Sequence, residues 1–220
     1  MSSLSSNWTD SPASEQRQRR TGVRILLVVI SSLFFLFFVA YMIRAQLSDW
    51  EHLSAPWRPL EQSLLLGINT AVLLLSSICI QYARVQSHKV AQGENEHQKN
   101  YGTASFALLC AGVFAMVFLA GQLLVWRQLT GLGYGVAGNP ANSFFFLLTG
   151  LHGLHLAAGL ALWLRAVLRV ALGAPMAEAA TTIELCAIYW HYLLALWLLL
   201  YALLTSSPEN YAAFAKMCGL

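Results

Sequence analysis

Two histidines stand one helical turn apart in "FFFLLTGLHGLHLAAGLALWL", an apolar stretch from 144 to 164 that contains no charged residue. In such a setting His152 and His155 could hold a metal or haem, move protons, or join helices. A third histidine, His191, lies in the next apolar stretch, seven residues after Glu184 and on the same helical face. Because a helix rises about 1.5 Å per residue, we expect His155 and His191 to lie at similar heights in antiparallel helices.

The most specific chemical hypothesis for these residues is a haem with His155 and His191 as its two axial ligands. The other histidines outside this stretch fall in predicted loops, so only one such haem could be built. A two-metal site would need carboxylates around the histidines, and Glu184 is the only acidic residue within reach. Without a cofactor, the same residues would form a buried polar network, because ionisable side chains in lipid usually pair with one another inside the bundle.

The candidates for a structural polar network or for lipid binding lie on the last two predicted helices. They are Thr149, His152, His155, Glu184, Tyr189, Trp190 and His191. A second polar set marks one narrow face of the second predicted helix, because Asn69 and Ser76, and likewise Thr70 and Ser77, are seven residues apart. Together with Gln122 we expect this set to make interhelical hydrogen bonds, worth about 1 kcal/mol each in lipid.

The composition places these residues in an integral membrane protein. The 220 residues are 57% hydrophobic and 10% charged, and the mean hydropathy is +0.57, outside the usual range of soluble domains. A helix needs roughly 20 apolar residues to cross about 30 Å of hydrocarbon, and five stretches supply them. We predict an all-α bundle of five transmembrane helices, at about 24–44, 62–84, 101–126, 143–165 and 183–205.

The remaining organisation follows from polarity and charge. Residues 1–20 are predicted to be a polar, disordered segment, 21–208 the transmembrane domain, and 209–220 a short external tail. Lys and Arg gather before the first predicted helix and in the connections after the second and the fourth. Since short loops rich in Lys and Arg stay in the cytoplasm, we expect a cytoplasmic N-terminus and an external C-terminus.

Two further features exclude functions rather than suggest them. The net charge of +3 reflects this topological signal, and no basic patch with interleaved aromatic residues suggests a nucleic-acid partner. The four cysteines are scattered without a C-x-x-C pattern, which favours packing over a disulfide or copper site. No predicted span contains a proline, which disfavours a transporter with broken helices.

The sequence resembles subunit III of the haem-copper terminal oxidases over roughly residues 24 to 205. The most specific similarity is in the last two helices, and weaker similarity continues upstream. The matching features are "TGLHGLH" at 149–155, Gly159, Glu184, "YWH" at 189–191 and Trp197, and upstream "VISSLFFLFF" at 29–38, "WRPL" at 57–60, "NTAVLLLSS" at 69–77, Phe118 and Gln122.

The resemblance implies a five-helix bacterial form of this subunit, in a multi-pass arrangement in the inner membrane. Such subunits have no active site or redox centre of their own; haem and copper are expected in partner subunits, the catalytic subunit I and subunit II. They bind phospholipid in a cleft between helices. They are thought to stabilise the catalytic subunit during oxygen reduction and proton translocation.

Three positions depart from the family pattern. Ser32, Val125 and Leu194 stand where the family often has carboxylates. Their loss removes the groups most suited to handling protons in the membrane, which favours a structural and lipid-binding role. One alternative is the subunit-III-like component of a nitric oxide reductase complex. A second alternative is a b-type haem cytochrome that uses His155 and His191.

Overall fold

The computed structural model describes residues 12–47, 49, 64–92, 97–173 and 176–205. These residues form five α-helices without any β-strand: α1 (Pro12–Ala45), α4 (Leu64–Ala91), α5 (His97–Gly131), α6 (Pro140–Ala171) and α7 (Met176–Thr205). Each is long and apolar enough to cross a membrane, which confirms the predicted all-α fold. Residues 1–11 of the predicted N-terminal segment, the motif at Trp57 and the predicted tail at 209–220 lie outside the described residues.

All five helices are longer than the predicted spans. The 32 residues of α6, for example, correspond to about 48 Å at about 1.5 Å per residue, well beyond about 30 Å of hydrocarbon. The extra turns contain charged side chains such as Arg20, Lys89 and Arg169. A stretch without charges therefore marks the part of a helix that lies in hydrocarbon, whereas the helix itself continues into the interface.

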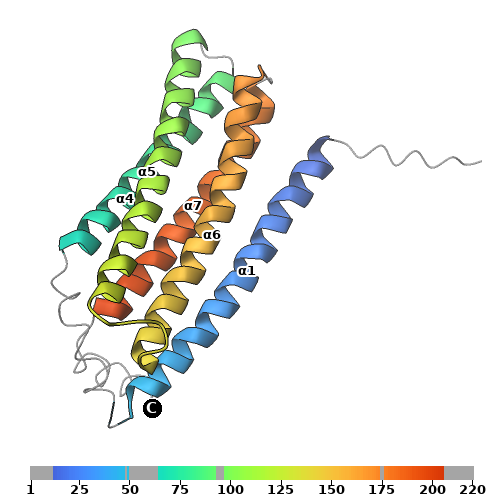
Figure 1. Ribbon diagram of the computed structural model, residues 1–220. Helices are drawn as coiled ribbons and strands as arrows, with labels where there is room; N and C mark the ends of the chain where they lie inside the picture. Colours follow the sequence, from blue (N-terminus) through green and yellow to red (C-terminus); the bar gives the residue numbers. More distant parts are fainter. Residues whose placement is uncertain (1–11, 48, 50–63, 93–96, 174–175, 206–220) are drawn as a thin grey trace, which may run out of the picture.

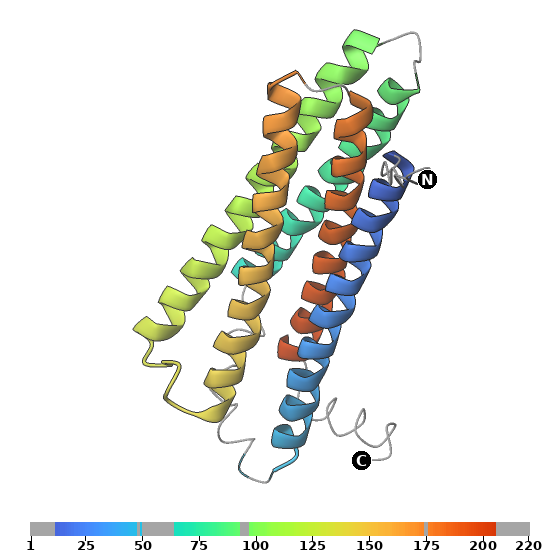
Figure 2. The ribbon, with the colours of Figure 1, turned by 90° about the vertical axis from the view of Figure 1, so that its right-hand side faces the viewer.

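Four helices form the bundle and α1 lies along its edge (Figures 1 and 2). The most extensive packing is between α4 and α5, followed by α4 with α7 and α6 with α7, whereas α1 packs against α7 and, less, against α6. Only 22% of the apolar window of α1 is buried, compared with 39% in each of the other four helices. The helix α1 is therefore open to lipid or to another subunit over most of its surface.

Glycines allow the bundle helices to approach closely. The indole of Trp163 on α6 covers Gly112 on α5, and its Nε1 donates a hydrogen bond to the Leu108 carbonyl at 2.7 Å. One turn earlier on α6, a Cβ at Gly159 would lie 3.0 Å from Cε1 of Tyr189 on α7. Lipid provides no hydrophobic drive between helices, so this close contact is a main source of their attraction.

The two ends of α6 have clear local signals. Asn139 is the N-cap, and its side chain accepts a hydrogen bond from the Asn142 backbone N–H at 2.8 Å. Pro140 follows at the first helical position, where its missing N–H costs nothing. At the other end, Gly173 has φ +76, a left-handed conformation that stops the helix. These signals fix the register in which α6 presents its histidines.

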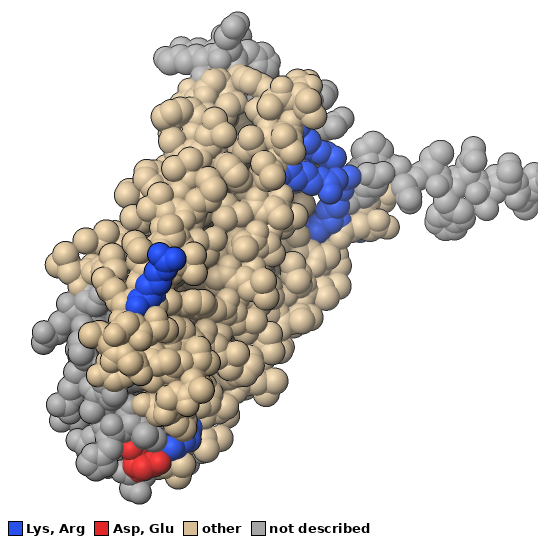
Figure 3. All heavy atoms as spheres, viewed as in Figure 1, with Lys and Arg blue, Asp and Glu red and all other residues tan. Residues whose placement is uncertain are grey.

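The outer surface is largely uncharged. Figure 3 shows a mostly tan face, with Lys and Arg near the start of α1 and an acidic group close to its other end. There Arg44 forms two hydrogen bonds of 2.8 Å to Asp49, which hold the pKa of the Asp49 carboxyl below its usual value. Large apolar side chains such as Leu154 and Phe106 are exposed between the ends, as expected for a surface in contact with lipid.

Candidate functional site

A hydrogen-bond relay crosses three helices near Trp190. The Trp190 indole on α7 donates to Ser76 Oγ on α4 at 2.8 Å, and Ser76 Oγ donates to the Ala111 carbonyl on α5 at 2.6 Å. Trp190 and Ser76 are almost completely buried, so no water competes for these groups. The relay satisfies each polar group by a group on a neighbouring helix, which fixes the relative height of the three helices.

His191 also joins α7 to α4, through both ring nitrogens. Nδ1 lies 2.6 Å from Ser77 Oγ, and Nε2 lies 3.1 Å from Gln81 Oε1. The amide oxygen of Gln81 can only accept, so Nε2 has the hydrogen, and Nδ1 of the neutral ring can accept from the Ser77 hydroxyl. The ring therefore serves as a clamp between two helices, with both nitrogens occupied.

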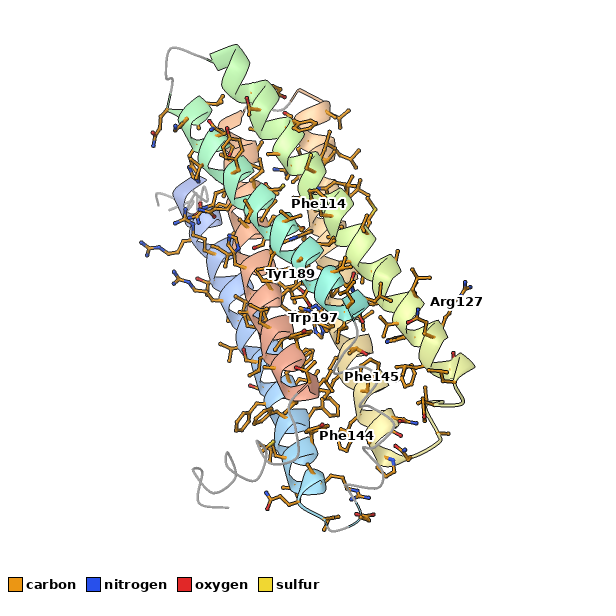
Figure 4. All side chains as sticks on the ribbon, turned by 90° about the vertical axis from the view of Figure 1, so that its left-hand side faces the viewer. Phe114, Arg127, Phe144, Phe145, Tyr189 and Trp197 are labelled. Carbon is orange, nitrogen blue, oxygen red and sulfur yellow. The ribbon has the colours of Figure 1, made fainter. Side chains whose placement is uncertain are left out.

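One helical repeat further along α7, Trp197 completes the contact with α4. Its Nε1 donates to Thr70 Oγ1 at 3.0 Å, while the Thr70 hydroxyl donates to the Leu66 carbonyl at 2.9 Å. Figure 4 shows Trp197 in the centre of the bundle, on the same helix as Tyr189. The face of α4 that the seven-residue spacing identified thus faces α7 at Thr70, Ser76 and Ser77.

The contact between α6 and α7 uses the backbone of His155 rather than its ring. The Tyr189 hydroxyl donates to the His155 carbonyl at 3.0 Å. The ring of His155 turns back to its own helix, where Nδ1 lies 2.7 Å from the Leu151 carbonyl, and it packs against Phe34 of α1 with ring centroids 5.6 Å apart. His155 therefore lies where α1, α6 and α7 meet.

Thr149 and His152 lie deeper, between α5, α6 and α7. The Thr149 hydroxyl donates to the Phe145 carbonyl at 2.7 Å and accepts from Trp126 Nε1 of α5 at 3.2 Å. His152 is 0% exposed and packs between two aromatic rings, Phe118 of α5 and Trp197 of α7, at centroid distances of 6.0 and 5.1 Å. This part of α6 is thus held by ring contacts, edge-on to Phe118 and tilted to Trp197, and by the hydrogen bond from Trp126.

Glu184 lies beside two arginines and a histidine ring. Its carboxylate lies 2.9 Å from Arg20 of α1 and 3.8 Å from Arg84 of α4, with His88 of α4 at 3.9 Å. The Glu184 side chain is 12% exposed, whereas the three partners are one third to one half exposed. A mostly buried carboxylate within reach of two guanidinium groups joins α1 to the bundle at the end where α7 begins.

Substitution of Glu184 by Gln should weaken the attachment of α1. Arg20 and Arg84 would then face one another without a counter-charge, so we expect a loss of about 1–3 kcal/mol, between the values typical of exposed and of buried pairs. The measurement is the thermal midpoint in detergent at low and high salt, with a smaller salt response in the variant. As a control, Asp49→Asn breaks the exposed pair with Arg44 at the other end of α1 and should change the midpoint little.

The structure divides the residues predicted to form one network into separate groups. His191 bonds to α4, the His155 ring to its own helix, Glu184 to cations, and His152 packs among rings. His191 bonds to α4 because α4 lies against α7 and places the Ser77 hydroxyl and the Gln81 amide beside the ring. Ligation of haem by His191 would break one of its two hydrogen bonds. Among the described residues, no three His, Cys, Asp or Glu side chains gather in a possible metal site.

The three positions without a carboxylate have different surroundings. Val125 is 1% exposed in the core, and Leu194 is half-buried against it. Ser32 is exposed, and its hydroxyl donates to the Val28 carbonyl at 2.9 Å. It lines an apolar groove of about 650 Å³ between α1 and α7, in which the neighbouring Ser31 hydroxyl lies 2.8 Å from that of Tyr192.

Several functional contacts were missed by sequence reasoning. Sequence reasoning did not predict Trp163 or Gln81 as partners. It also did not predict the groups around Glu184, which are Arg20, Arg84 and His88. Arg84 and His88 could have been found, because they lie four residues apart near the end of a helix and a membrane carboxylate needs a counter-charge. Nothing in the sequence could have shown that Trp163 covers Gly112, because that contact depends on how α5 and α6 cross.

Comparison with known proteins agrees with this architecture. Residues 11–206 match the family model for cytochrome c oxidase subunit III. Cytochrome c oxidase subunit 3 of Thermostichus vulcanus is 32% identical over 189 residues, which cover 84% of this chain and 86% of that protein. The same subunit of Synechocystis is 31% identical, with 84% and 74% covered.

A further relative is a subunit of a ubiquinol oxidase. Cytochrome bo(3) ubiquinol oxidase subunit 3 of Pseudomonas aeruginosa is 28% identical over 135 residues, which cover 60% of this chain and 58% of that protein. The matched residues span all five helices. Taken with five helices that can each span a membrane, the family match identifies this multi-pass membrane chain as belonging to the cytochrome c oxidase subunit III family.

Proposed function

We propose that this chain is the non-catalytic subunit III of a bacterial haem-copper respiratory oxidase, which uses cytochrome c or quinol. It binds beside the catalytic subunit I, with subunit II in the same complex, and supports oxygen reduction coupled to proton translocation. The observation that supports this most is the family match over residues 11–206. Haem and copper belong to the partner subunits in this proposal, and the chain has no active site of its own.

The internal contacts support a structural role. Each of three α7 side chains, Trp190, His191 and Trp197, bonds to a hydroxyl on α4. These hydrogen bonds join α7 to α4. A rigid bundle of this kind can support a neighbouring subunit at low entropic cost. The neutral residues Ser32, Val125 and Leu194 leave these positions without a group that could take up protons, so we assign proton handling to the partner.

We assign lipid binding to the groove between α1 and α7. It measures about 650 Å³ and is lined mainly by apolar side chains, including Phe35, Phe38 and Leu199. An acyl chain would fit such a lining. The guanidinium of Arg20, on the same helix, is about half exposed beside Glu184 and could contact a lipid phosphate.

The orientation that we propose has α1 beginning in the cytoplasm and the described chain ending outside, in the bacterial inner membrane. The helix ends with most Lys and Arg, including Arg17, Arg24 and Arg84, would then face the cytoplasm. Attachment of a reporter enzyme or a cysteine label to either terminus would test this assignment.

The first experiment is mass spectrometry of the proteins that copurify with a tagged chain from native membranes in mild detergent. A large haem-copper subunit with a copper-centre subunit would support the oxidase role. A c-type cytochrome subunit in its place would support the nitric oxide reductase alternative. Phospholipid extracted from the same preparation tests the lipid assignment, and recovery of the chain alone would contradict the proposed function.

Replacement of His191 by Ala separates a structural role from haem binding. We expect about 1–2 kcal/mol of lost stability, from two interhelical hydrogen bonds at about 0.6–1 kcal/mol each. The haem spectrum of the complex should not change. Ser77→Ala removes one of the two bonds and should cost about half as much. Loss of a haem absorption band that belongs to this chain would instead support the cytochrome alternative.

A further inference from the structure

Two polar side chains inside the bundle have no hydrogen-bond partner within the described chain. These are Gln122 on α5 and His152 on α6, and the lack of a partner applies to both polar atoms of each side chain. Gln122 is 5% exposed and His152 is 0% exposed. Roughly nine in ten buried polar groups in proteins are paired, and an unpaired group costs about 1–3 kcal/mol. Four such atoms in one region therefore require a partner.

The contacts around them place Gln122 and His152 in the same layer. On α5, Phe118, Gln122 and Trp126 are four residues apart and so share one face. Phe118 packs on the ring of His152, and Trp126 donates a hydrogen bond to Thr149, one turn before His152. Gln122 lies on α5 between these two contacts, on the face that Phe118 and Trp126 turn toward α6 between Thr149 and His152.

A partner for these atoms has to be small and able both to donate and to accept. A Gln amide has donors and an acceptor, and a neutral imidazole has one of each. Another subunit or a lipid head group cannot reach a histidine that is 0% exposed. A metal ion would find only one strong ligand, because Gln122 is an amide. Water fits all three requirements, with two to four polar partners in a buried site.

We propose that the interior between α5 and α6 contains one or two structural water molecules, which bridge the Gln122 amide and the His152 ring. A third residue extends the polar layer to the far side of α5. Asn69 Nδ2 on α4 is also buried without a partner within the described chain, and the Asn69 amide lies directly against Gly121, the neighbour of Gln122. The waters would thus complete the internal hydrogen bonding of the bundle where side chains alone leave it incomplete.

The direct test is a density map of the intact complex at about 2 Å resolution. Buried waters in the partner subunits provide the internal standard for detection. We expect density within hydrogen-bond distance of both the Gln122 amide and the His152 ring. A direct hydrogen bond between the two side chains, or an empty space between them in a map that shows other buried waters, would overturn the proposal.

Variants test the same site through stability. Gln122→Leu and His152→Phe each leave the other residue and the waters with fewer partners, so each should lower the thermal midpoint by about 2–4 °C. The double variant removes all four unpaired atoms and should lie closer to wild type than the sum of the single shifts. Gln128→Leu, at an exposed position on the same helix, is the matched control. Additive shifts would contradict a shared water site.

Discussion

Replacement of Trp190 by Ala should destabilise the bundle more than any other single change that we propose. Truncation of a buried Trp costs about 3–5 kcal/mol in soluble cores. We expect about 2–4 kcal/mol here, because lipid already solvates apolar side chains and only the packing and hydrogen-bond losses remain. The Trp190 indole is 1% exposed and begins the relay through Ser76 to α5. The measurement is the fraction of folded chain during titration with a denaturing detergent.

Two further variants separate the contributions of packing and hydrogen bonding. Trp190→Phe keeps most of the ring volume and removes the N–H, so it should cost about 1 kcal/mol, the value of one interhelical hydrogen bond. Ile188→Ala changes an exposed side chain two residues earlier on the same helix and should have little effect. If Trp190→Ala were no worse than Ile188→Ala, the relay would not stabilise the bundle.

Replacement of Gly112 by Ala should also have a large effect. A Cβ at this position would overlap the indole ring of Trp163. That ring cannot move away without losing its 2.7 Å hydrogen bond to the Leu108 carbonyl, so α5 and α6 have to separate. Overpacking of this kind costs about 1–3 kcal/mol. The loss should appear as a lower thermal midpoint of the purified complex.

The matched control for this change lies on the same helix. Gly102 has no atom within 4 Å of a Cβ, so Gly102→Ala meets no neighbour and gains helix propensity. It should leave the midpoint unchanged or raise it slightly. A second comparison, Trp163→Leu in the Gly112→Ala background, should restore part of the loss, because the obstructing ring is gone. Equal midpoints for Gly102→Ala and Gly112→Ala would show that the helices adapt without strain.

The sequence predicted the fold because the signal for membrane helices is strong and local. Runs of apolar residues gave all five helices, and the seven-residue spacing of Asn69 with Ser76 and of Thr70 with Ser77 identified the buried face of α4. The helices extend beyond the predicted spans, since charged residues end an apolar run but not a helix. Arg84 and His88, for instance, continue α4 well past its apolar part.

The pairing of side chains could be predicted only in part. Spacing placed Glu184 and His191 on one face of α7. Glu184 pairs with arginines on α1 and α4, whereas His191 bonds to a hydroxyl and an amide on α4. Sequence periodicity specifies which face of a helix is buried but not which neighbour covers it. The position of α4 against α7 is a property of the whole bundle. Because of this position, the His191 ring contacts Ser77 and not His155.

The place of α1 at the edge of the bundle has a consequence for biosynthesis. Arg20 on α1 and Glu184 on α7 form an ion pair across 164 residues of sequence. At about 5–20 residues per second, a ribosome needs roughly 10–30 s to synthesise that length of chain. During this interval α1 is already made but its main neighbour does not yet exist. Of the five described helices, α1 is thus made earliest, and it meets its main neighbour α7 only after α4, α5 and α6 have been made.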